Sequence, residues 1–136
     1  MDEKFLNIAY EEAIKAYSLG EVPVGCVIVN NNVIIGKGHN LKEKNKDATA
    51  HAEIIAIKEA SKNLNDWRLN GCSIYITMKP CPMCMGAIRE SRISKIIYVV
   101  DSDNVKNYYN DLLIVKSNIL YKKCLMLLKS FFKEKR

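Results

Sequence analysis

Apolar side chains recur at helical spacing at both ends of the chain. Residues 3–18 predict an amphipathic helix that Gly20 can terminate. Its apolar positions are Phe5, Ile8, Ala9, Ala13, Ala16 and Tyr17. Residues 120–132 predict a closing helix of the same kind. Its inward-facing positions are expected to be Leu120, Cys124, Leu127, Leu128 and Phe131.

Short β-branched runs between these helices predict strands. Val24–Val29 and residues 33–35 flank Asn30–Asn32, and this segment predicts a hairpin because Asn tolerates positive φ. Further strands are expected at residues 72–77, 96–100 and 112–115. Helices are expected at residues 52–64 and 82–91, and a polar loop at residues 39–50. This alternation predicts an α/β fold in which helices cover both faces of a mixed sheet.

The length and the composition of the chain favour one globular domain spanning residues 1–136. The chain has 136 residues, 49% of them apolar, which is ordinary for a soluble domain. No apolar run approaches the roughly 18 residues that span a membrane. The chain opens on acidic and amphipathic residues without the pattern of a signal peptide, so we expect a cytoplasmic protein with no membrane partner.

The positive charge of the chain is concentrated at its end. Residues 113–136 hold seven basic side chains against the single acidic side chain of Glu134, so this segment carries the whole net charge of +6. A localised basic tail can attract a phosphate backbone. A charge run is more often a solvated face, so charge alone leaves nucleic-acid binding open.

Two short motifs each open a predicted helix. The first is His51-Ala52-Glu53, and the second places Cys81 and Cys84 at CxxC spacing after Pro80. Cysteines three apart share one helix face, and the N-terminal turn favours thiolates, which are good zinc ligands. One imidazole completes a three-ligand set with an open position for water, the arrangement of a catalytic zinc site. Glu53, two residues from His51, could then move protons at that water.

Each motif also has a plainer interpretation. CxxC alone could be a redox pair, or half of a structural zinc site closed by Cys72, Cys26 or His39. His51 alone could be a helix cap, and Glu53 alone could be an acid that favours the helix dipole. The pair H-x-E and P-C-x-x-C, each opening a helix, is the more specific signal and is the signature of zinc deaminases that act on nucleobases.

The chain resembles the cytidine deaminase superfamily, and most closely the bacterial tRNA adenosine deaminase family, over most of its length. The similar segments are Gly20–Gly25, Gly36, Gly38–Asn40, Asp47–Glu53, Arg68–Leu69, Gly86–Ile88, Ser91–Ile93 and Phe131–Lys133 with Arg136. The resemblance implies a three-layer α/β/α cytidine-deaminase-like fold with a mixed five-stranded sheet. It also implies one Zn²⁺ per chain on His51, Cys81 and Cys84, with Glu53 as proton shuttle.

The same resemblance implies how substrate would be held. Asn40 would contact the base edge and Val24 would line the pocket. Phe131, Phe132 and Lys133 would lie near the anticodon stem of a tRNA. The implied partners are a tRNA anticodon loop and a second copy of the chain in a homodimer, and the implied reaction converts adenosine to inosine at the wobble position.

Two departures from that family bear on the substrate. The family usually has an acidic residue before the Pro-Cys pair, where this chain has Lys79, and residues 99–110 contain no glycine. These departures favour an alternative enzyme of the same superfamily that deaminates a free base or nucleoside, such as guanine or cytosine. A third hypothesis is a non-catalytic zinc-binding partner subunit.

Overall fold

A mixed sheet of five strands runs through the centre of the part that the computed structural model describes, residues 2–102 and 111–135. The strands are β1 (Gly25–Asn30), β2 (Val33–His39), β3 (Ser73–Met78), β4 (Lys95–Val100) and β5 (Leu113–Lys116). Their order across the sheet is β2-β1-β3-β4-β5. β1 is antiparallel to both of its neighbours, whereas β3, β4 and β5 are parallel. The predicted mixed sheet is therefore confirmed.

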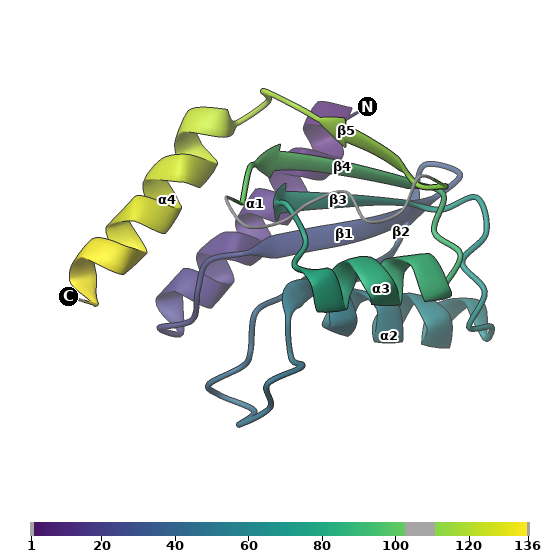
Figure 1. The fold of residues 1–136 in the computed structure, drawn as a ribbon, viewed down its shortest axis with the longest axis horizontal. Coiled ribbons are helices and arrows are strands. Elements are labelled where there is room, and N and C mark those ends of the chain that lie inside the picture. Colours follow the sequence, from purple (N-terminus) through teal and green to yellow (C-terminus); the bar gives the residue numbers. More distant parts are fainter. Residues whose placement is uncertain (1, 103–110, 136) are drawn as a thin grey trace.

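Helices cover both faces of this sheet (Figure 1). They are α1 (Asp2–Ser18), α2 (Ala52–Leu64), α3 (Pro82–Glu90) and α4 (Tyr121–Glu134). Successive residues of β1 separate the two faces, since side chains alternate along a strand. Cys26 and Ile28 pack into the core under α2 and α3, while Val27 and Val29 pack into the core under α1 and α4. This arrangement confirms the three-layer α/β/α fold.

The hairpin between β1 and β2 turns at the predicted asparagines. Asn31 and Asn32 have φ angles of 50° and 65°, and Asn30 pairs with Val33 across the turn. Positive φ at both central residues gives a turn whose twist matches that of the flanking strands. The predicted hairpin is therefore confirmed, both in its position and in its cause, which is the positive φ that asparagine tolerates.

β2 is longer than the sequence predicts, because two glycines let it lie directly under α2. An added Cβ at Gly36 would come within 2.4 Å of the backbone oxygen of Ala56, and one at Gly38 within 2.2 Å of that of Ala52. The sequence predicts a strand only over residues 33–35, because glycines and polar residues follow. In the structure the missing side chains are what allows the strand to continue to His39.

Replacing Gly38 with alanine should lower the free energy of unfolding by about 1–3 kcal/mol, because the new methyl group must push α2 away from the sheet. Urea unfolding would measure the loss. Lys37→Ala is the matched control, since Lys37 is exposed on the other side of the same strand and should change stability by less than about 0.5 kcal/mol. Equal unfolding midpoints for Gly38→Ala and the wild type would contradict the close packing.

The starts of α2 and α3 meet at one edge of the sheet. His39 at the end of β2 pairs with Gly25, and the amide of Gly25 donates to Oγ1 of Thr77 near the end of β3, with a 3.2 Å separation. The loops that follow β2 and β3 therefore bring both helix N-termini to this edge, as is usual for binding sites in α/β folds. Within the described residues, no helix is long and apolar enough to cross a bilayer.

Candidate active site

His51 and Glu53 occupy the first turn of α2. His51 is the N-terminal cap residue, with an extended backbone (φ −78°, ψ 158°), and its side chain makes no capping hydrogen bond. The extended residue allows the side chains of His51 and Glu53 to converge, which they could not do in the middle of a helix. Glu53 is only 4% exposed. The imidazole is therefore left available as a ligand beside a buried carboxyl group.

Cys81 and Cys84 occupy the matching position on α3. Cys81 is the cap residue, also extended (φ −70°, ψ 169°), and Pro82 opens the helix. Proline suits this position because its missing N–H would have no partner in the first turn. Cys84 is completely buried and Cys81 partly so. Both thiols face the start of α2.

The three side chains form a metal-ligand group. Nδ1 of His51 lies 3.6 Å from Sγ of Cys81 and 3.6 Å from Sγ of Cys84, and all three ligand atoms lie within 4.8 Å of one another. Zinc bonds of about 2.3 Å to sulfur and about 2.0–2.1 Å to nitrogen, at a tetrahedral angle, would separate those atoms by about 3.6 Å. The residues present therefore fit Zn²⁺ in both chemistry and spacing.

The three residues that could have closed a structural zinc site, Cys26, Cys72 and His39, do not belong to this ligand group. Among the described residues, the only such group of histidine, cysteine and acidic side chains is His51, Cys81 and Cys84. Nδ1 of His39 contacts Glu12 instead, and Cys26 and Cys72 lie in the core under α2 and α3. A zinc ion held by these three side chains would keep one position open, which is the arrangement of a catalytic site.

The charges of the site prepare it for a metal. A hydrogen bond with Cys84 lowers the pKa of Cys81 to about 5, aided by a backbone amide and by His51, and the same bond raises the pKa of Cys84. One thiolate is therefore present before a metal binds, and binding displaces the remaining proton. Burial raises the pKa of Glu53 to about 7, so this carboxyl can both accept and return a proton near neutral pH.

The ligand group opens into a cavity of about 280 Å³. Asn40 and Val24, both expected from the resemblance, line it together with His51, Glu53 and Cys81. Lys79, which the sequence already placed next to the metal motif, also lines the cavity. Sequence reasoning did not assign the remaining lining residues, which are Val22, Lys42, Ala52, Met78 and Ser102. Val22, Lys42 and Met78 lie two or three residues from predicted positions, whereas Ser102 follows β4 and reaches the cavity because β4 lies beside β3 in the sheet.

A buried carboxylate shapes the loop between β2 and α2. Glu21 is 1% exposed, and its two carboxylate oxygens accept the backbone amides of Glu43 and Lys44 at 3.0 and 2.7 Å. The Oδ1 atom of Asn40 accepts the amide of Lys42 at 3.0 Å. These bonds hold the loop that carries Asn40 toward the cavity, and sequence reasoning missed the role of Glu21 because its partners lie more than twenty residues away.

The expected tail residues divide between core and surface. Phe131 is 8% exposed and belongs to the buried face of α4, while Phe132 is 49% exposed and Lys133 is exposed. Phe132 and Lys133 line a second hollow of about 750 Å³, which shares Met78 with the first cavity. Contact of these three residues with a tRNA stays a prediction, and the ring of Phe131, which packs against that of Phe132, is the least accessible of them.

Comparison with known proteins agrees with this geometry. Residues 1–100 match the model of the cytidine and deoxycytidylate deaminase zinc-binding region, which defines the class of protein. The chain is 40% identical to the tRNA-specific adenosine deaminase of Bacillus subtilis over 146 residues, covering 99% of this chain and 91% of the relative. Within the zinc-dependent deaminases, this chain therefore belongs to the tRNA-specific adenosine deaminase family.

Solved structures show the same fold. One, from work on A-to-I editing by tRNA deaminases at the wobble position, has a TM-score of 0.77 and 29% identity, covering 84% of this chain and 97% of its own. The guanine deaminase of Bacillus subtilis has a TM-score of 0.70 and 27% identity, covering 94% and 93%. The chain is thus a zinc-dependent hydrolase whose fold also serves enzymes that act on a free base.

Proposed function

We propose that this chain deaminates adenosine to inosine at the wobble position of a tRNA. The observation that carries the proposal is the three-ligand group with Glu53 in a small cavity that adjoins a basic and aromatic hollow on α4. The cavity, of about 280 Å³, is small, so a base in RNA would have to leave its stack to reach the ligand group, which is least costly in a loop. The names of the relatives support the same substrate.

Each side chain has a distinct part in the reaction. His51, Cys81 and Cys84 would hold Zn²⁺, which supplies a Lewis acid and an activated water at neutral pH. Glu53 would accept one proton from the attacking water and deliver it to the ring nitrogen. It would then accept the proton of the new hydroxyl group on the ring carbon and give it to the departing amine, so that both protons of the water are accounted for. Asn40 orients the base edge, and Val24 packs against the ring. Adenosine and water become inosine and ammonia.

The basic hollow would hold the RNA around the target base. Lys129 and Lys133 line it beside the exposed ring of Phe132. Ammonium groups attract phosphates, and an exposed aromatic ring can stack on an unpaired base. These side chains provide contacts that a free nucleoside would not use.

Deamination of an anticodon stem-loop should weaken as salt rises. Between 50 and 200 mM salt, kcat/KM should fall by about tenfold if a few phosphates are neutralised. Replacing both Lys129 and Lys133 with glutamine should flatten this dependence, while Lys37→Gln on β2, at the opposite edge of the sheet from β5, serves as control. A stem-loop rate that stays constant over this range would contradict phosphate binding.

A product assay on the zinc-loaded protein tests the substrate directly. Mass spectrometry would follow a stem-loop with adenosine at the wobble position, and separately free guanine, cytosine, adenosine and cytidine. Inosine in the RNA alone supports the proposal. Ammonia from a free base with unmodified RNA supports the alternative, which is favoured by one observation, namely that Lys79 places a positive charge on the cavity wall.

We also propose one Zn²⁺ per chain and a homodimer, in the cytoplasm where tRNA is found. Ile54 and Ile55 on α2 are only partly buried, and Met83 on α3 is 38% exposed. These apolar side chains lie beside the zinc ligands on the outer helices, where a second copy would cover them. Light scattering and metal analysis on the purified protein test both points, and a monomer at micromolar concentration contradicts the dimer.

A further inference from the structure

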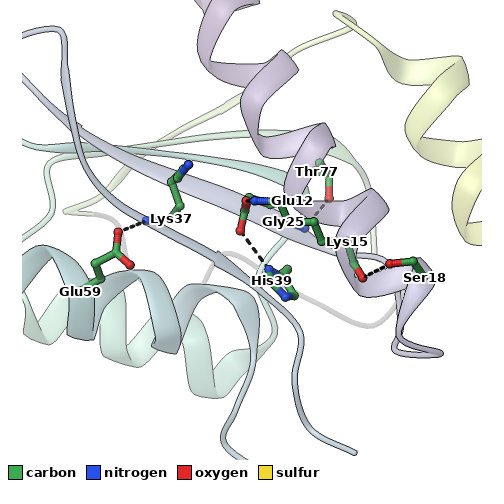
Figure 2. A network of polar contacts seen from close by, with 8 residues as sticks. All are labelled: Glu12, Lys15, Ser18, Gly25, Lys37, His39, Glu59 and Thr77. Atoms are coloured by element: carbon green, nitrogen blue, oxygen red, sulfur yellow. Dashed lines mark hydrogen bonds and ion pairs between the residues drawn. The ribbon is translucent and has the colours of Figure 1, made fainter. Parts of the chain in front are cut away.

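A buried acidic side chain of α1 takes no part in the proposed chemistry. The side chain of Glu12 is 6% exposed, although it lies on the helix that packs against the opposite face of the sheet from the zinc ligands. Figure 2 shows its carboxylate between His39 of β2 and Lys15 of its own helix. Buried charges are uncommon unless they are paired, so these contacts merit an explanation.

Both carboxylate oxygens of Glu12 are engaged. Oε1 lies 2.9 Å from Nδ1 of His39, and Oε2 accepts Nζ of Lys15 at 2.5 Å. Burial raises the pKa of Glu12, but the hydrogen bonds and charges of Lys15 and His39 outweigh it and lower the pKa. The carboxylate is therefore ionised at neutral pH and bound between the helix and the strand end.

The strand end that Glu12 holds leads directly into the cavity wall. His39 is the last residue of β2 and pairs with Gly25, the first residue of β1. The next residues outward on the two strands are Asn40 and Val24, which both line the cavity. The amide of Asn40 also donates to the backbone oxygen of Val24 at 3.2 Å. Any movement of His39 is therefore transmitted to Asn40 over one peptide unit.

α1 is a firm support for this contact because it lies very close to β1. An added Cβ at Gly25 would come within 2.1 Å of the backbone oxygen of Ala9 and 2.4 Å of the amide nitrogen of Ala13. Such close backbone packing leaves little freedom for the helix to shift. Glu12 thus connects a fixed helix to the side chain of the last residue of β2, in addition to the ladder and to the packing of Gly38 against α2.

We infer that Glu12 is a positioning residue for the target base, acting through His39 to fix the orientation of Asn40. This inference rests on the proposed function, in which Asn40 contacts the edge of the target base. The zinc ligands and Glu53 start from different segments, so Glu12 affects how substrate is held and not the metal or the proton transfer.

Glu12→Ala and His39→Ala should each raise KM by about tenfold, with kcat changed by less than about twofold. Asn40 holds the base in both the ground state and the transition state, and loss of such uniform binding appears in KM. Zinc content should stay at the wild-type value. A merely structural role would instead lower the fraction of folded enzyme, and hence apparent kcat, with KM unchanged.

A double-mutant cycle with Asn40→Ala tests whether Glu12 acts through Asn40. Once Asn40 is removed, Glu12→Ala should raise KM by no more than about twofold further, because neighbours that act as one unit are not additive. Glu12→Gln, which keeps an acceptor oxygen for His39, should recover part of the wild-type KM. Fully multiplicative effects in the cycle would overturn the inference.

Two control variants remove nearby contacts without touching the strand end. Glu59→Ala deletes a carboxylate that accepts the amide of Lys37 at 3.2 Å, earlier on β2. Lys15→Met removes the other partner of Glu12, whose side chain is 56% exposed. Both should keep KM within about twofold of the wild type.

The two proposals fail in different ways. The proposed function fails on the wild-type protein alone, if RNA remains unmodified while a free base is deaminated. The positioning role fails if the wild type is active and Glu12→Ala keeps its KM. Since Asn40 lines the cavity in either case, the cycle is run with whichever substrate the wild-type protein converts.

Discussion

Replacing Glu53 with glutamine should lower the deamination rate by about 10²- to 10⁴-fold and leave zinc in place. Glutamine keeps the size and one acceptor oxygen of the buried side chain but cannot carry a proton between water and substrate. The three metal ligands are untouched, since Glu53 contacts Cys84 and is not itself one of the group. Single-turnover rates together with metal analysis would separate the two effects.

Glu59→Gln on the same helix is the matched control. Glu59 is exposed and takes no part in the cavity, so the substitution should leave both rate and zinc content at wild-type values. Turnover of Glu53→Gln within about tenfold of the wild type would show that another group moves the protons. Loss of zinc from that variant would instead make Glu53 part of the metal site.

Replacing Cys84 with alanine should remove both zinc and turnover. The thiol is completely buried and would provide one of the three proposed protein ligands, and the remaining two should not bind the metal comparably. Zinc bound only by the folded chain also stabilises it, so a strong chelator should lower the melting temperature of the wild type by about 10 °C. The melting temperature of Cys84→Ala should not respond to the chelator.

Cys72→Ala is the control for a buried cysteine outside the ligand group. Cys72 lies in the core near the start of β3, so the variant should lose some stability yet keep stoichiometric zinc and its response to the chelator. Stoichiometric zinc on Cys84→Ala, measured by mass spectrometry under native conditions, would contradict the ligand set.

Some of the site could be predicted because local sequence sets it. Cys81 and Cys84 are three residues apart at one helix start and share a face, and at the other helix start the extended cap residue His51 converges with Glu53. The hairpin at Asn31 and Asn32 is local in the same sense. These features depend on interactions between residues a few positions apart, so they can be predicted from the sequence pattern.

Other parts of the site depend on contacts far apart in the chain. Glu12 and His39 are separated by 27 positions, and neither residue by itself signals the other. Ser102 reaches the cavity because β4, which it follows, lies beside β3 in the sheet. The orientation of α4 similarly decides that Phe131 is buried and Phe132 exposed, although the two residues are adjacent and chemically identical.

By itself, the sequence determined that a histidine and two cysteines suited to a metal, with a carboxyl group beside them, stand at two helix starts, because residue types and spacings are local properties. Only the tertiary structure decided which side chains surround that site and how they are held. The sheet order and the packing of α1 and α4 bring distant segments together. Burial among those segments explains why the carboxylates of Glu12 and Glu21 bind distant partners and why Phe131 is less exposed than Phe132.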